Sequence, residues 1–145
     1  MSRRAVVAAI GAASILGSCG GIKAPDLFIV ERTGTVPGAR LTLVVNEEGG
    51  VRCNGEPTQT EPTHPTLKLS DPQLVEARAI QEALHDPASR HLSLSPGPGS
   101  VFSYYVRDEN GTVSFSDNSP SQPHVLRQLQ LFVLQAAQQI CHLPE

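Results

Sequence analysis

The residue types best suited to covalent chemistry in this chain are three cysteines, and the first of them, Cys19, stands in a distinctive setting. It directly follows Leu16-Gly17-Ser18. An apolar run from Ala5 to Leu16, interrupted only by Ser14, precedes that tripeptide, and Arg3 and Arg4 precede the run. A positive start, a short apolar stretch and small residues before a cleavage point are typical of a secretion signal. The run is about a dozen residues, short of the ~20 that a membrane-spanning helix needs.

Because the residue after the cleavage point is a cysteine, Leu16-Gly17-Ser18-Cys19 resembles the lipobox of bacterial lipoproteins. The resemblance implies that the Cys19 thiol receives a diacylglyceryl group, that the chain is cut before Cys19, and that the new N-terminus is acylated, for example with palmitate. It also implies a lipid anchor on the outer face of the cytoplasmic membrane. The alternative is an ordinary secretory signal that contains a cysteine. The two arginines suit either general or twin-arginine export.

The other two thiols, Cys53 and Cys141, would then lie in an oxidising compartment. Two cysteines in an exported protein predict one disulfide. A metal site would need more ligands than these two residues, and two buried free thiols are the remaining alternative.

No further pattern indicates catalysis or metal binding. The chain lacks the nucleophile elbow, the zinc-protease helix motif, the phosphate-binding loop and the dinucleotide fingerprint. Zinc bound through His85 and His91 would require a loop geometry that a sequence cannot show. We therefore predict no enzyme activity, no cofactor, no metal site and solvent-exposed histidines. The histidines are His64, His85, His91, His124 and His142.

Three other polar groups have simpler structural explanations. Asp108, Asn110 and Thr112 alternate as in a calcium loop, but the closing Glu is missing, which favours a hairpin turn. The adjacent carboxylates Glu47-Glu48 should point apart in a solvated turn. The serines Ser114, Ser116 and Ser119 have no obvious base beside them.

Composition predicts one small, loop-rich domain. The chain has 145 residues, 12 Gly, 12 Pro, no Trp and a formal net charge of −3. A mildly acidic chain without a Lys/Arg cluster argues against nucleic acid as a partner. We expect a signal peptide over residues 1–18, a lipidated tether over 19–25 and a single domain over 26–145.

Alternating apolar residues predict the strands. Residues 26–33 and 40–46 are typical of two strands, and a third begins at 51–53 after a Gly-Gly turn. Residues 67–69 suit a short further strand. The runs on either side of Asn110-Gly111 predict a hairpin, because Asn-Gly between alternating segments is a strong turn signal.

Two amphipathic segments predict helices. The first begins at Ser70, which has capping-box spacing to Gln73, and should end near His85 because Pro87 follows. The second begins within residues 119–123 and runs to about Cys141. The order of elements predicts an α+β fold, a small antiparallel sheet of about five strands with both helices packed on one face.

The same order has a family parallel. Phe28-Ile29-Val30-Glu31-Arg32-Thr33-Gly34, a helix after Ser-Asp-Pro, a hairpin with Tyr104 and Asn110-Gly111, and a closing helix together resemble the emfourin family in layout. Those small proteins inhibit thermolysin-like metalloproteases. The resemblance implies a shared fold and, as an alternative function, protease inhibition; no inhibitory residue carries over.

Function is therefore expected from a surface. We predict a non-enzymatic binding or accessory lipoprotein that docks an unidentified envelope protein. The Pro-rich loops 54–66 and 92–100, an edge strand or an exposed sheet face are the candidate surfaces. An inhibitor would need a rigid protruding loop, for which 33–38 and 54–66 are suited, whereas an accessory protein would show an apolar patch on the sheet face away from the helices.

Overall fold

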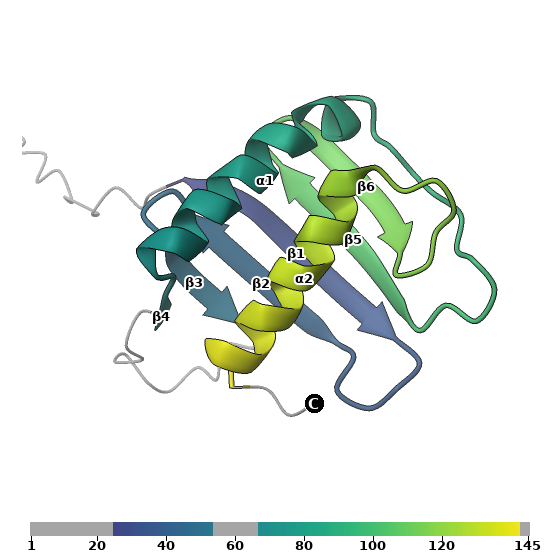
Figure 1. The fold of residues 1–145 in the computed structure, drawn as a ribbon, viewed down its shortest axis with the longest axis horizontal. Helices are drawn as coiled ribbons and strands as arrows, with labels where there is room; N and C mark the ends of the chain where they lie inside the picture. Colours follow the sequence, from purple (N-terminus) through teal and green to yellow (C-terminus); the bar gives the residue numbers. More distant parts are fainter. Residues whose placement is uncertain (1–24, 54–66, 143–145) are drawn as a thin grey trace, which may run out of the picture.

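The sheet is built around its first strand. The computed structural model describes residues 25–53 and 67–142. In chain order the elements are β1 (Asp26–Gly34), β2 (Leu41–Asn46), β3 (Gly50–Cys53), β4 (Leu67–Lys68), α1 (Asp71–Ser89), β5 (Phe102–Asp108), β6 (Gly111–Ser116) and α2 (His124–Gln139). The strands lie in the spatial order β4-β3-β2-β1-β5-β6, with neighbours antiparallel (Figure 1). The predicted α+β fold is confirmed, with six strands because the two-residue β4 joins the sheet.

Side-chain alternation decides which face of the sheet forms the core. On β1, Phe28 and Val30 are buried, and Val30 pairs with Leu43 of β2 and Val106 of β5, which are buried too. Because successive side chains of a strand point to opposite faces, these residues share one side of the sheet. The core therefore lies on that side.

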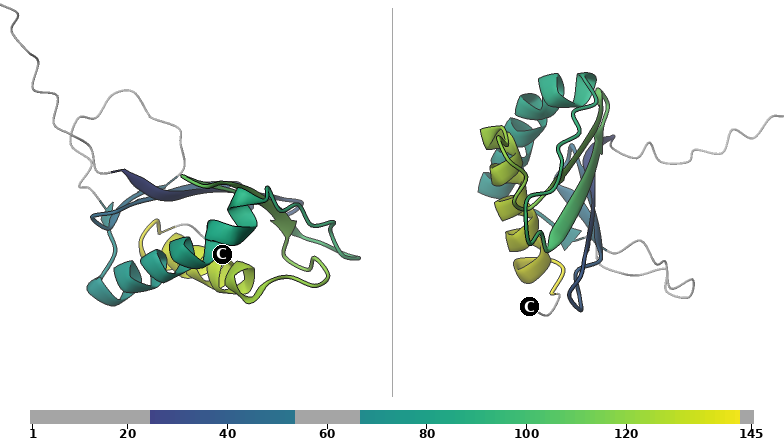
Figure 2. Two further views of the ribbon diagram at one scale, coloured as in Figure 1. Left: turned by 90° about the horizontal axis from the view of Figure 1, so that it is seen from above. Right: turned by 90° about the vertical axis from the view of Figure 1, so that its right-hand side faces the viewer.

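Both helices cover the core side of the sheet, and the opposite face is not covered by any described element (Figure 2). Phe28 of β1 meets Phe132 of α2 edge to face, with ring centroids 5.9 Å apart. The predicted capping box at the start of α1 is confirmed, since the Ser70 amide donates to Gln73 Oε1 over 2.9 Å and the Gln73 amide donates back to the Ser70 hydroxyl.

The predicted end of the first helix near His85 is wrong. α1 continues through Pro87 to Ser89. A proline lacks the N–H that would bond to the preceding turn, which normally ends a helix. Here Pro87 and Ala88 are buried, so apolar packing offsets the missing bond, and the Leu92 amide closes the turn on the Pro87 carbonyl over 3.0 Å. Neither described helix has the length and apolar character needed to cross a membrane.

The segment after α1 is also more ordered than a plain loop. The Leu94 amide donates to the Ser114 carbonyl over 2.8 Å, and the Ser114 amide donates to the Leu92 carbonyl over 2.9 Å. Residues 92–94 thus cover the outer edge of β6. An uncovered strand edge invites pairing with other chains, and this contact protects it.

The predicted disulfide is confirmed. Cys53, at the end of β3, is bonded to Cys141, two residues after α2 ends, and their Cα atoms are 5.8 Å apart. The bond joins the closing helix to the β3 side of the sheet, across 88 residues of sequence.

Candidate functional site

Two ends of the sheet are built differently, and one of them collects long loops. Residues 35–40, 95–101 and 117–123 meet where β1 ends and β5 begins, and we call them the loop end (Figure 1). At the opposite end lie the turns 47–49 and 109–110, which we call the turn end. The loop end contains residues 35–38 of the 33–38 segment that the sequence indicated as a protruding loop, whereas Thr33 and Gly34 end β1.

The connection between β1 and β2 carries an exposed apolar tip. The Ala39 amide donates to the Val36 carbonyl over 3.2 Å, with Pro37 and Gly38 between them. Gly38 has φ +76°, so proline followed by a glycine of positive φ forms a type II turn. The Val36 side chain is 43% exposed. The turn is a narrow projection whose backbone is fixed by residues well suited to it.

A buried arginine holds this turn against the sheet. Arg32 Nε donates to the Ala39 carbonyl over 2.9 Å, and the guanidinium lies 5.0 Å from the centre of the Phe102 ring. The Thr35 amide donates to the Val101 carbonyl over 3.2 Å. At Gly34 a Cβ would lie 2.6 Å from that carbonyl oxygen, so only glycine lets the two chains approach. The Arg32-Thr33-Gly34 motif thus has a structural role, which is to fix the loop after it.

Two polar side chains join the other loops together. Asn118 accepts from the Gly97 amide over 3.0 Å and donates to the Pro98 carbonyl over 2.7 Å. Asp117 accepts from the Ser100 hydroxyl over 2.9 Å and from the Val101 amide over 3.2 Å. Because Val101 also accepts from Thr35, the three loops form one hydrogen-bonded unit. These carboxylate and amide groups are committed to shaping the loops.

Beside these loops lies an open groove of about 470 Å³ along the first half of α2. Leu131, which is 60% exposed, gives the groove an apolar side chain, and Arg127 gives it a cation. The carboxylate of Asp117 and the amide side chains of Asn118, Gln122 and Gln130 line it as well. The lining is therefore of mixed polarity, with one apolar side chain and charges of both signs.

A buried tyrosine lies beneath the loop end. The Tyr104 ring stacks on Phe115, with centroids 5.0 Å apart, and pairs with Arg32 across β1 and β5. Burial raises the pKa of the Tyr104 hydroxyl, and the Arg32 charge beside it lowers that pKa in part. The hydroxyl therefore stays protonated and can form hydrogen bonds. Its position beside Arg32 indicates that Tyr104 supports this arginine.

The sheet face away from the helices is of mixed polarity. Its apolar side chains among the described residues are Ile29 and Val44, both half-buried, and Tyr105, which is 40% exposed. They are flanked by ion pairs, Arg107 with Glu31 at 3.2 Å and Arg52 with Asp26 at 3.3 Å. A broad apolar patch, expected for the accessory function, is not found on this face of the described sheet.

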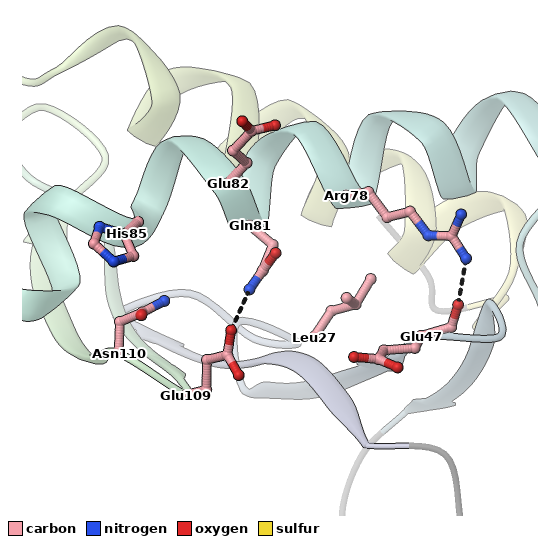
Figure 3. Close-up of a pocket in the computed structure, with 8 residues that line it drawn as sticks. All are labelled: Leu27, Glu47, Arg78, Gln81, Glu82, His85, Glu109 and Asn110. Atoms are coloured by element: carbon pink, nitrogen blue, oxygen red, sulfur yellow. Dashed lines mark hydrogen bonds between the residues drawn. The ribbon is translucent and has the colours of Figure 1, made fainter.

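A second groove, of about 520 Å³, runs between α1 and the turn end (Figure 3). Two hydrogen bonds cross it: Arg78 donates to the Glu47 carbonyl over 2.8 Å, and Gln81 donates to the Glu109 carboxylate over 3.3 Å. His85 lines the same groove. These contacts attach α1 to the strand ends, so the groove has a structural explanation.

The remaining polar groups singled out in the sequence do not converge. The described histidines are all exposed, and His91 contacts the Thr112 hydroxyl at 3.2 Å. Asp108 accepts from the amides of Asn110 and Gly111, as expected for a hairpin turn. The Ser119 hydroxyl accepts from the Ser116 amide. Within residues 25–53 and 67–142, no three His, Cys, Asp or Glu side chains gather as a metal site would require.

Cys19, His64 and the 54–66 loop lie outside the described residues. The sequence pointed to 33–38 but not to Arg32, which holds this turn, nor to Asp117 and Asn118, which hold the 95–101 loop beside it. A signal did exist for Arg32, because it alternates with Phe28 and Val30 and so falls on the buried face of the strand, where an arginine needs a partner.

Comparison with known proteins gives no family assignment. No protein-family model matches the chain, and neither does any curated protein or solved structure. The lipobox and the emfourin-like layout therefore stay predictions.

Proposed function

We propose that the mature chain is a lipid-anchored protein of the cell envelope that acts by binding another envelope protein through its loop end, and not by catalysis. The observation that carries this proposal is the bracing of three separate loops into one unit beneath an exposed Val36. A preorganised tip loses little conformational freedom on binding, so more of its contact energy becomes affinity.

The position of the anchor supports the same assignment. The Pro25 carbonyl accepts from the Glu47 amide over 3.0 Å, so the chain enters the sheet at the turn end. Six residues separate Cys19 from Asp26, and each spans at most ~3.5 Å. β1 has nine residues, each rising ~3.3 Å, and leads from there to the loop end. An anchored domain would thus carry its loop end about 30 Å beyond the attached end.

The anchor is tested by mass spectrometry of the mature N-terminus. We expect an acylated Cys19, and we expect Cys19→Ala to move the protein from the membrane fraction to the soluble fraction. An unmodified N-terminus on a protein that stays in the membrane fraction would contradict the anchor.

The binding surface is tested by crosslinking the tagged full chain in its native envelope. Val36→Asp should abolish the crosslinked complex, whereas Val75→Asp should not, because Val75 is an equally apolar, 67% exposed residue on α1. If both variants lose the crosslinked complex equally, or if neither loses it, the loop end is excluded as the contact surface.

Protease inhibition is a second candidate, favoured by the rigid turn at 36–39 and by the emfourin-like layout. Thermolysin is the direct probe. An inhibitor would reduce peptide hydrolysis in proportion to the amount of mature chain added, and Val36→Asp would restore it. Unchanged hydrolysis with a large molar excess of the chain would exclude this candidate.

A further inference from the structure

The arginines of the described residues differ in whether they have a protein partner. Five of them donate to a carboxylate or a carbonyl: Arg32, Arg52, Arg78, Arg90 and Arg107. The other two, Arg40 and Arg127, are exposed and make no hydrogen bond or ion pair with the described part of the chain. Arg40 ends the 35–40 loop, and Arg127, in the first turn of α2, lines the groove beside residues 117–122 of the loop end.

The carboxylates are distributed in the opposite way. The three loops of the loop end contain one acid, Asp117, whose oxygens accept from Ser100 and Val101. The turn end carries Glu47, Glu48 and Glu109. The chain is acidic overall, with a formal charge of −3, whereas Arg40 and Arg127 outnumber the single acid Asp117 in the loop end and the groove beside it.

A free arginine alone is no indication of a ligand, because an exposed guanidinium is well solvated. Here, however, each free arginine shares a loop or a groove with an exposed apolar side chain. Arg40 follows the turn with Val36, and Arg127 shares a groove with Leu131. Apolar anchors with arginines beside them are the residue types enriched where proteins bind proteins.

We infer that the loop end recognises an acidic protein surface: Val36 enters an apolar pocket of the partner, and Arg40 and Arg127 pair with carboxylates around that pocket. This inference rests on the proposed function and adds the chemistry of the partner. An anionic lipid or phosphate polymer would also attract the arginines, but it offers no pocket to a valine on a rigid turn.

The test uses the full chain in its native envelope with a benzophenone amino acid in place of Thr35, an exposed neighbour of Val36. Light should produce a discrete protein adduct. The crosslinked protein is identified by mass spectrometry and purified, and its Kd for the mature chain is then measured by calorimetry at low and high salt.

We expect Val36→Asp to weaken binding by about thirtyfold or more, the loss typical of a buried anchor. Arg40→Glu and Arg127→Glu should each weaken it by about tenfold at low salt and less at high salt, because exposed charge pairs are screened. Arg90→Glu, which reverses an exposed arginine already paired with Asp86, is the matched control and should change Kd less than twofold.

The outcomes separate this inference from the proposed function. If Val36→Asp weakens binding and the two charge reversals do not, the acidic partner is wrong and the loop end stands. If only Tyr105→Glu on the opposite sheet face weakens binding, both proposals fail. If no protein adduct forms, or if the arginines serve only binding to phosphatidylcholine–phosphatidylglycerol vesicles, the protein partner is excluded.

Discussion

The two ends of this sheet solve the problem of chain reversal in different ways. At the turn end each turn is closed by its own neighbours, and Arg78 and Gln81 of α1 add one contact to each. Asn46 Oδ1 accepts from the amides of Glu48 and Gly50 over 3.0 and 2.7 Å, and Asp108 Oδ1 accepts from those of Asn110 and Gly111 over 2.7 and 3.0 Å. These turns need only a few consecutive residues.

At the loop end the stabilising contacts join segments far apart in sequence. Asn118 binds Gly97 and Pro98, Asp117 binds Ser100 and Val101, and Thr35 binds Val101. A two-residue turn would suffice to join β1 and β2. The loop end therefore has more chain, and more polar side chains committed to its shape, than the connection of strands requires, which is what a binding surface needs and a simple turn does not.

The largest expected effect tests whether the two ends belong to one cooperative unit. Replacing Cys53 and Cys141 together by alanine should lower the free energy of unfolding by about 4 kcal/mol, because the disulfide closes a loop of 88 residues in the unfolded chain. Urea denaturation measures the change. Hydrogen exchange should speed up at both ends alike, and selective exposure of one end would show that the bond protects only a local region.

A smaller effect should appear at one end only. Arg32→Met removes the donor to the buried Ala39 carbonyl and the contact with the Phe102 ring, and should cost about 2 kcal/mol. Hydrogen exchange at the Thr35 and Ala39 amides should accelerate more than at the turn end. The control Arg107→Met removes an exposed ion pair and should cost less than about 1 kcal/mol. Equal acceleration of hydrogen exchange at both ends would show that the loop end is not stabilised separately from the turn end.

A matched pair of asparagines sharpens the comparison further. Asn46→Ala and Asn118→Ala each remove two hydrogen bonds and should each cost about 1 kcal/mol. The two substitutions should differ in how far along the chain their effects extend. Chemical shift changes for Asn46→Ala should stay near Glu48 and Gly50, whereas those for Asn118→Ala should extend into the 96–100 loop. Confinement of both patterns to adjacent residues would show that the loops at the loop end are not coupled.

Local patterns in the sequence predict most of the fold. Alternation in β1 and β2, the capping box at Ser70, the hairpin at Asn110-Gly111 and the pairing of Cys53 with Cys141 all follow from residues and their spacing. Pro87 led to a wrong helix end, because the cost of the missing helix bond can be seen in the local sequence, whereas the burial that offsets it depends on tertiary packing. The pairing of residues 92–94 with β6 likewise depends on tertiary structure and not on local sequence.

The candidate site is less predictable because its contacts are non-local. Pro37 and Gly38 predict a turn. Nothing near them in sequence shows that Arg32 donates to the Ala39 carbonyl and packs against the Phe102 ring. Likewise, Asn118 and Gly97 become neighbours only once β5 and β6 have placed their loops together. Sequence can therefore suggest that a loop protrudes, whereas its rigidity depends on the assembled sheet.

The smallest effect concerns the tyrosine beneath the loop end. Burial raises the pKa of Tyr104 above the ordinary value of 10.0. The unfolded chain therefore loses this proton at a lower pH than the folded chain, so the stabilisation is fully present below about pH 10 and is lost as pH rises through the raised pKa. We expect the free energy of unfolding to fall over that alkaline range and Tyr104→Phe to reduce the fall. Tyr105→Phe, which removes the hydroxyl of the only other tyrosine, should retain this fall.

The loop end should loosen before the turn end in this pH range, because ionised Tyr104 would disturb the position of Arg32, which holds the 35–40 loop. Hydrogen exchange at the amides of Thr35 and Gly111 measures that order, and earlier loss at Gly111 would contradict it.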